Sequence, residues 1–230
     1  MKKNILLIGG SYGIGNALAK TLENDHNVIV ASRSNEGLEG MDVTHIPFDA
    51  TTMTLPEIDL PDPIHGFVYF PGSINLKPVK MLDEKAYRED MEINYFGLVN
   101  TVKSVLPKMA AGGSMVFFST VAVSTGMPFH TSVAGAKGAI EGFVRSLAAE
   151  YAPNFRCNVV APSLVDTPLA KRLLNNERKR EAMNERHPLK RVGTAEDIAQ
   201  TVQFLLSDNS SWMTGQVIGV DGGLSTLNLS

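Results

Sequence analysis

A glycine-rich loop follows the first apolar run of the chain and has the composition of a pyrophosphate site. Residues 5–8 lead into Gly-Gly-Ser-Tyr-Gly-Ile-Gly, after which apolar residues recur with helical spacing. Glycine permits positive φ and close backbone approach, and a helix N-terminus offers free N–H groups and the positive end of its dipole. The pattern predicts a dinucleotide phosphate site at Gly9, Ser11, Tyr12, Gly13 and Ile14. A tight turn that only packs is the alternative.

The second apolar run ends in Ser32, Arg33 and Ser34, where an acidic side chain would favour NAD. Arginine can pair with a phosphate through two hydrogen bonds and stack on adenine, and serine adds short hydroxyl donors. The sequence therefore predicts NADP, with Ser32 and Arg33 near its 2′-phosphate. An exposed basic turn is the alternative, and Glu36 is close enough in sequence to reach a ribose and weaken the preference.

The elements that must position these groups alternate between short apolar runs and longer helical patterns. Strands are predicted over residues 4–8, 27–31, 43–48, 66–70, 114–118, 157–161 and 217–220. Helices are predicted over 14–23, 84–109, 133–150 and 195–206, with a basic helical segment at 169–186. Because the strands are apolar on both faces, they indicate an α/β fold with a doubly wound parallel sheet of about seven strands.

One crossover is too short and too rich in proline for a long helix. Residues 49–63 contain Pro56, Pro61 and Pro63, so we expect one edge of the sheet to be thinly covered. No linker divides the chain, and residues 1–230 are predicted to form a single domain.

Composition excludes several classes of protein. The 230 residues contain 21 Lys and Arg against 24 Asp and Glu, a net charge of −3, which does not favour nucleic acid as a partner. No apolar run is long enough to cross a membrane, and the run that follows Lys2 and Lys3 is too short for a signal peptide. Cys157 is the single cysteine, so we expect no internal disulfide, no metal site that depends on cysteine, and a cytoplasmic location.

The chain resembles the short-chain dehydrogenase/reductase family, whose loop reads Thr-Gly-x-x-x-Gly-x-Gly. Gly9, Gly13 and Gly15 match, with Ile8 in place of the threonine. Further matches extend over most of the chain: Asp49-Ala50, Asn94, Lys137 and the segments 162–167, 188–199 and 220–223. The resemblance implies a Rossmann fold and hydride transfer between a nicotinamide and a small carbonyl or alcohol substrate.

The resemblance also implies roles for residues around the cofactor. Asp49 would bind the adenine amino group and Ala50 would line its pocket. Val165 and Thr167 would orient the nicotinamide. After the fourth strand the family has Asn-Asn-Ala-Gly, whereas this chain has Tyr69-Phe70-Pro71-Gly72. Only Gly72 is kept, and the two aromatic residues are expected to pack in the core.

By the same resemblance, Asn94, Thr120 and Lys137 are the candidate catalytic residues. The family places its tyrosine four residues before the lysine, where this chain has Val133, and no tyrosine lies between Tyr95 and Tyr151. Each retained residue also has a plain interpretation: Lys137 as a surface lysine, Thr120 as a turn cap and Asn94 as a structural amide. The remaining candidates for a proton donor are His130, a water held by Asn94 and Lys137, and Thr120 itself.

Two functions fit these observations. The first is an NADP-dependent oxidoreductase with an altered proton donor, and the second is a cofactor-binding protein that regulates or associates without turnover. The family's substrate lid corresponds to residues 168–190, whose basic side chains either attract an acidic substrate or form a solvated face. The resemblance also implies a homo-oligomer, a tetramer or a dimer, built on the helices predicted over 84–109 and 133–150.

Overall fold

The computed structural model describes residues 2–55 and 60–228, which form a seven-stranded parallel sheet in the order β3-β2-β1-β4-β5-β6-β7. The strands are β1 (Lys3–Ile8), β2 (His26–Ser32), β3 (Val43–Pro47), β4 (Ile64–Tyr69), β5 (Met109–Phe118), β6 (Phe155–Pro162) and β7 (Val217–Val220). All seven predicted strands are present. From β1 the chain adds β2 and β3 on one side, and it then crosses to add β4 on the other side of β1. The carboxyl ends of β1 and β4, where the strand order changes direction, therefore border a crevice.

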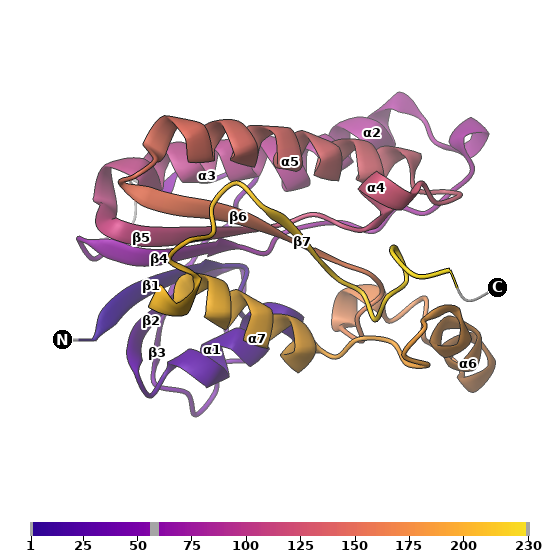
Figure 1. Cartoon of the computed structure of the whole chain (residues 1–230), viewed down its shortest axis with the longest axis horizontal. Helices are drawn as coiled ribbons and strands as arrows, with labels where there is room; N and C mark the ends of the chain where they lie inside the picture. The colour runs from indigo at the N-terminus through magenta and orange to yellow at the C-terminus, as the bar shows by residue number, and fades with distance from the viewer. Residues whose placement is uncertain (1, 56–59, 229–230) are drawn as a thin grey trace.

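Helices cover both faces of the sheet (Figure 1). They are α1 (Gly13–Leu22), α2 (Glu84–Met91), α3 (Gly97–Val105), α4 (Ala122–Thr125), α5 (Thr131–Tyr151), α6 (Glu177–Arg186) and α7 (Ala195–Leu206). In Figure 1, α3 and α5 lie above the sheet, α1 and α7 lie below it, and α6 stands at one end. The predicted doubly wound α/β architecture, the Rossmann fold, is confirmed. No helix in the described part of the chain has the length and apolar character needed to cross a membrane.

Alternate residues of each strand supply two separate cores. On β1, Leu6 and Ile8 pack toward α3 and α5, whereas Ile5 and Leu7 pack toward α1 and α7. All four side chains are buried. Because successive side chains of a strand point to opposite faces, an apolar run buries both faces only when helices lie on each side. This packing fixes the strands whose carboxyl ends carry the site.

The predicted continuous helix over 84–109 is wrong. It consists of α2, a π-helical turn (Glu92–Phe96), α3 and a 3-10 turn (Leu106–Lys108), and Met109 already belongs to β5. Pro107 lies in that 3-10 turn, where proline is tolerated but cannot continue an α-helix. Asn94 therefore lies in a π-helical turn, a feature frequent at functional sites.

The basic segment predicted to be helical over 169–186 is only partly so. Pro168–Ala170 forms a 3-10 turn, and α6 begins only after Asn176, whose side chain accepts a hydrogen bond from Lys179 N and caps the helix. The short helix α4 had no predicted counterpart.

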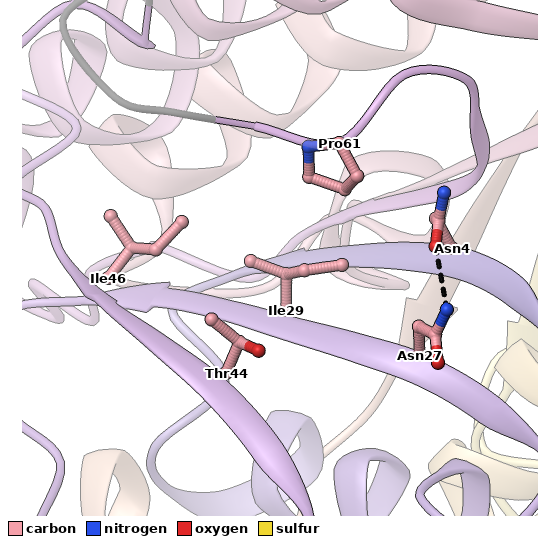
Figure 2. Close-up of a pocket in the computed structure, with 6 residues that line it drawn as sticks. All are labelled: Asn4, Asn27, Ile29, Thr44, Ile46 and Pro61. Carbon is pink, nitrogen blue, oxygen red and sulfur yellow. Dashed lines mark hydrogen bonds between the residues drawn. The ribbon is translucent and has the colours of Figure 1, made fainter.

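At the β3 edge of the sheet, none of the five residues of β3 is fully buried. A cavity of about 250 Å³ opens over β2 and β3, lined by Asn4, Asn27, Ile29, Thr44, Ile46 and Pro61. Figure 2 shows Ile29 and Ile46 on the strands with Pro61 opposite them, and the hydrogen bond that joins Asn4 to Asn27. Asn4 and Asn27 are near the amino ends of their strands. Pro56 lies outside the described residues.

Candidate active site

The glycine loop connects β1 to α1 at the crevice. Gly9 and Gly13 have φ values of +79° and +53°, which other residues rarely adopt. A Cβ built on Gly13 would lie 3.2 Å from Thr167 Cγ2. The structure thus brings the loop against the turn that follows β6, and Thr167 faces Gly13 across a space that a side chain would close.

Tyr12 ties this loop to the turn after β2. Its hydroxyl lies 2.7 Å from Ser34 Oγ and donates to Glu36 Oε2 at 2.9 Å. Ser32 is buried, and its hydroxyl donates to Ser34 O at 2.8 Å. The Ser32 proton is therefore used within the turn, and Arg33, whose side chain is exposed, is the cation at this end of the crevice.

Asp49 and Ala50 follow β3 in a tight turn. Asp49 Oδ1 accepts hydrogen bonds from Thr51 N at 2.9 Å and from Thr51 Oγ1 at 2.7 Å. These bonds hold the pKa of Asp49 below its ordinary value, and the charge of Arg33 lowers it further. A Cβ on Gly97 would lie 2.7 Å from Ala50 O, so this turn packs closely on the start of α3. The carboxylate of Asp49 is thus held by Thr51, and its ionised form is favoured.

Lys137, Asn94 and Gly72 meet at the carboxyl end of β4. A Cβ built on Gly72 would lie 3.1 Å from Asn94 Oδ1 and 3.3 Å from Lys137 Nζ. Both side chains are buried, with exposed fractions of 0% for Asn94 and 8% for Lys137. Asn94 Oδ1 has no hydrogen-bond partner among the described residues. Any side chain at position 72 would occupy the space that the two polar groups share.

Burial changes the acidity of Lys137. Desolvation lowers the pKa of its ammonium group to about 8, and the charge of Asp90 opposes part of that fall. A group with such a pKa is mostly protonated at neutral pH and still able to give up the proton. These are the properties of a general acid that works near pH 7.

The residues present fit a dinucleotide. The glycine loop and Gly72 leave room that Cβ atoms would fill, and a Cβ on Gly9 would lie 3.1 Å from Pro71, the residue before Gly72. The helix α1 begins at Gly13, so its free N–H groups face the loop. The unpartnered Asn94 Oδ1 supplies a buried acceptor at the end near Lys137.

Comparisons with known proteins decide the family. Residues 59–225 match the family model described as enoyl-(acyl carrier protein) reductase. The 3-oxoacyl-[acyl-carrier-protein] reductase MabA of Mycobacterium tuberculosis is 31% identical over 233 residues, which are 97% of this chain and 93% of that relative. The chain belongs to the short-chain dehydrogenase/reductase family. The family resemblance predicted from the sequence is confirmed, and with it membership of a group of hydride-transferring oxidoreductases.

Two further matches show the extent of the similarity. The 3-oxoacyl-[acyl-carrier-protein] reductase FabG of Thermotoga maritima is 39% identical over 146 residues, which are 62% of this chain and 58% of that relative, so this match spans less than two thirds of either protein. The ligand-free structure of aldohexose dehydrogenase from Thermoplasma acidophilum covers 100% of this chain and 96% of its own, with a TM-score of 0.89 and 27% identity.

Val133 lies on α5 four residues before Lys137, and its side chain is buried. Ser119 Oγ donates to Glu141 Oε1 at 2.6 Å, so its proton is used inside the chain. Thr120 Oγ1 accepts only a long bond of 3.3 Å from Ala122 N. The hydroxyl group of Thr120 therefore makes one weak capping contact, and it donates its proton to no acceptor among the described residues.

The other predicted residues have clear positions. Tyr69 is buried in the core as expected, and its hydroxyl donates to Ile93 O of the π-helical turn at 2.8 Å. Phe70 packs on Phe118 with ring centroids 5.0 Å apart. His130 precedes α5, and its Nδ1 lies 2.8 Å from Pro128 O. Val165 is buried and pairs with Gly193 beside Thr167.

A second cavity lies between the Gly72 loop and the segment after β6. It measures about 520 Å³ and is lined by Ile74, Pro168, Leu169, Lys171, Arg172 and Asn175. Arg180 of α6 pairs with Asp166 at 2.7 Å and so joins this segment to the turn that carries Thr167. Some of the basic side chains are thus tied down, whereas Lys171 and Arg172 border the cavity.

Sequence reasoning missed the polar side chains behind Asn94. Ser73 Oγ donates to Asp90 Oδ1, and Asn75 Nδ2 donates to the same oxygen at 2.8 Å. Asn94 Nδ2 in turn donates to Ser73 Oγ at 2.9 Å. The available signal was the four-residue spacing of Asp90 and Asn94, which places both on one helix face.

Proposed function

We propose that this protein is an NADP-dependent oxidoreductase for small carbonyl or alcohol compounds, in which Lys137 takes over the proton transfer that the family assigns to tyrosine. The observation that carries the proposal is the convergence of Lys137 Nζ and Asn94 Oδ1 on the space beside Gly72. Thr120, at the carboxyl end of β5, would hydrogen-bond the substrate oxygen. The buried, lone Cys157 is consistent with a cytoplasmic setting.

The residues that would hold the cofactor lie along the crevice. The loop at Gly9, Ser11, Tyr12, Gly13 and Ile14 would bind the pyrophosphate, and Ser32 and Arg33 the 2′-phosphate. Asp49 and Ala50 would hold the adenine, and Gly72, Lys137, Val165 and Thr167 the nicotinamide riboside. When bound, the reduced cofactor supplies a hydride, one hydrogen nucleus with two electrons, to the carbonyl carbon.

The chain's own residues would handle the proton. As the π electrons of the carbonyl bond move onto its oxygen, that oxygen takes a proton from the ammonium group of Lys137 and becomes a hydroxyl. The neutral amine of Lys137 is then reprotonated from solvent. Alcohol oxidation reverses these steps. The cavity beside Ile74 and Arg172 would hold the rest of the substrate, with residues 168–190 as its lid.

A screen of aldehydes and ketones with NADPH tests this function by the loss of NADPH absorbance. Turnover that depends on a carbonyl compound supports the enzyme. Tight NADPH binding with no turnover over a broad panel would instead favour a non-catalytic, cofactor-binding role. This role is the second candidate because Val133 has no hydroxyl group that could donate a proton.

Arg33→Ala should weaken NADPH binding about tenfold or more and leave NADH binding nearly unchanged. Loss of a charge-assisted phosphate contact costs about 1.5–3 kcal/mol, and about 1.4 kcal/mol corresponds to tenfold. Calorimetric titration of both cofactors measures the effect. Arg88→Ala, which removes an exposed arginine paired with Glu84 on α2, is the matched control. Equal losses for the two cofactors would contradict the assignment of NADP.

We also propose a homo-oligomer that covers the outer surface of α3 and α5. Val102, Val144 and Leu147 are buried within the chain, whereas Phe96 is 48% exposed beside Tyr95. Sedimentation at micromolar protein should give a dimer or tetramer, and Phe96→Asp should shift it toward the monomer because it places a charge in the apolar contact. A native monomer at that concentration would refute the assembly.

A further inference from the structure

Asp90 is an acidic residue in the interior of the protein. It lies in α2 with an exposed fraction of 0%. Its Oδ1 accepts hydrogen bonds from Ser73 Oγ and from Asn75 Nδ2. Its Oδ2 has no hydrogen-bond partner among the described residues. Burying a carboxylate costs free energy unless a charge or hydrogen bonds compensate. The two hydrogen bonds to Oδ1 compensate part of this cost, and a nearby cation would compensate the rest.

The hydrogen bonds around Asp90 have a fixed direction. Asn94 Nδ2 donates to Ser73 Oγ at 2.9 Å and to Asp90 O at 2.8 Å, and a main-chain carbonyl can only accept. Since Ser73 accepts from Asn94, its single proton is available for Asp90 Oδ1. Asp90 therefore acts as an acceptor from Ser73 and Asn75, and Asn94 Oδ1 is left to face the space beside Gly72, where Lys137 Nζ also ends.

The other charged groups near the cluster are used elsewhere or point to solvent. On α5, Glu141 binds Ser119 and Arg145. On α2, Arg88 pairs with Glu84, and Glu89 is exposed beside Lys85. Glu92, in the π-helical turn, is also exposed, and His130, at the start of α5, contacts Pro128 O. In the segment after β4, the neutral Ser73 and Asn75 bind Asp90, and Lys77 and Lys80 are exposed. Among the described carboxylates, Asp90 is thus the buried one whose charge raises the pKa of Lys137 and so favours its ammonium form.

We propose that Asp90 is a positioning residue that serves as the fixed counter-charge of Lys137 and keeps it in the ammonium form. The hydrogen bonds through Ser73 and Asn94 hold the carboxylate in place behind the site. The catalytic meaning of this pairing rests on the proposed function, in which the ammonium group gives its proton to the substrate oxygen. The proposed pairing does not depend on cofactor or substrate, so it can be tested in their absence.

The test is a pH titration of Lys137 followed by NMR of protein labelled with ¹³C at the lysine ε carbon, without cofactor or substrate. The Lys137 resonance is assigned by its loss in Lys137→Met. Asp90→Asn keeps the size of the side chain and an acceptor oxygen but removes the charge. We expect it to lower the midpoint of the Lys137 titration by about one pH unit or more. If this variant does not fold, Asp90→Val removes the charge together with its need for hydrogen bonds.

Two matched variants separate charge from structure. Glu89→Gln removes an exposed carboxylate from the same helix and should leave the midpoint unchanged. Ser73→Ala breaks the hydrogen-bond chain but keeps the charge of Asp90, so its shift should be the smaller one. An unchanged midpoint in Asp90→Asn, or an equal shift in either control, would overturn the pairing. A shift as expected in a protein that reduces no carbonyl would uphold the pairing and refute the proposed function alone.

Discussion

Lys137→Met should lower the rate of carbonyl reduction about 10²- to 10⁴-fold. A positioned general acid contributes about that factor, and Val133 leaves no tyrosine to replace it. Methionine matches the length of the lysine stem and avoids a cavity beside Gly72. Single-turnover rates with saturating NADPH separate this loss from weaker cofactor binding, which calorimetry reports. Lys103→Met, which changes an exposed lysine on α3, is the control. A variant that keeps more than half of the native rate would show that Lys137 does not supply the proton.

The same assignment predicts a pH dependence. Because the pKa of Lys137 is lowered to about 8, the proton donor is mostly present at pH 7 and is lost as the pH rises through about 8. Reduction should therefore slow above pH 8, and alcohol oxidation, which needs the neutral amine, should accelerate over the same interval. A reduction rate that stays constant from pH 7 to pH 10 would exclude Lys137 as the donor.

Val133→Tyr should accelerate carbonyl reduction, by as much as about 10²-fold, because it restores a phenol one helical turn from Lys137. The neighbouring cation would lower the pKa of the new phenol and so favour proton transfer at neutral pH. The measurement compares kcat for both forms over a panel of aldehydes and ketones at several pH values. Val133→Phe fills the same space without the hydroxyl and separates chemistry from packing, since Val133 is buried.

Two outcomes would contradict this prediction in different ways. Fast native turnover that falls in Val133→Tyr would show that the chain uses another donor, and His130 would be the next residue to replace. Absence of turnover in both forms would leave NADP binding as the activity of this site.

Sequence patterns predicted the architecture because a strand that is buried on both faces has a continuous apolar run, which can be recognised in each strand separately. Residues 5–8 and 28–31 are apolar throughout. The strands predicted over 4–8 and 27–31 were found as β1 and β2, with ends shifted by one residue at most. The helix predicted over 84–109 was too long because its apolar spacing continues past Pro107. Met109 instead begins β5 and pairs with Ile64, a residue that is distant in the sequence. Pairing across the sheet is not recorded in local periodicity.

The site was predictable where a backbone conformation requires a residue type. Gly13 and Gly72 stand at points of positive φ or close approach, and the sequence indicated both. Asp90 was not predictable, because it lies in Arg-Glu-Asp-Met-Glu, a run typical of a solvated helix face. Its burial arises from the segment after β4, where Ser73 and Asn75 close over it. That contact depends on tertiary structure.

The π-helical turn at Glu92–Phe96 determines which residues before and after it face the same side of the helix. In a regular α-helix, residues four apart advance by about 40° around the axis, so a row with that spacing drifts off a face. A wider turn reduces the angle per residue, which lets Asp90, Asn94, Leu98 and Val102, all buried, share one side. The hydroxyl of Tyr69 binds Ile93 O within this turn. The extra residue in this turn thus places the polar pair Asp90 and Asn94 on the same side as the apolar pair Leu98 and Val102. Deletion of a single residue from the turn would rotate one pair away from the sheet.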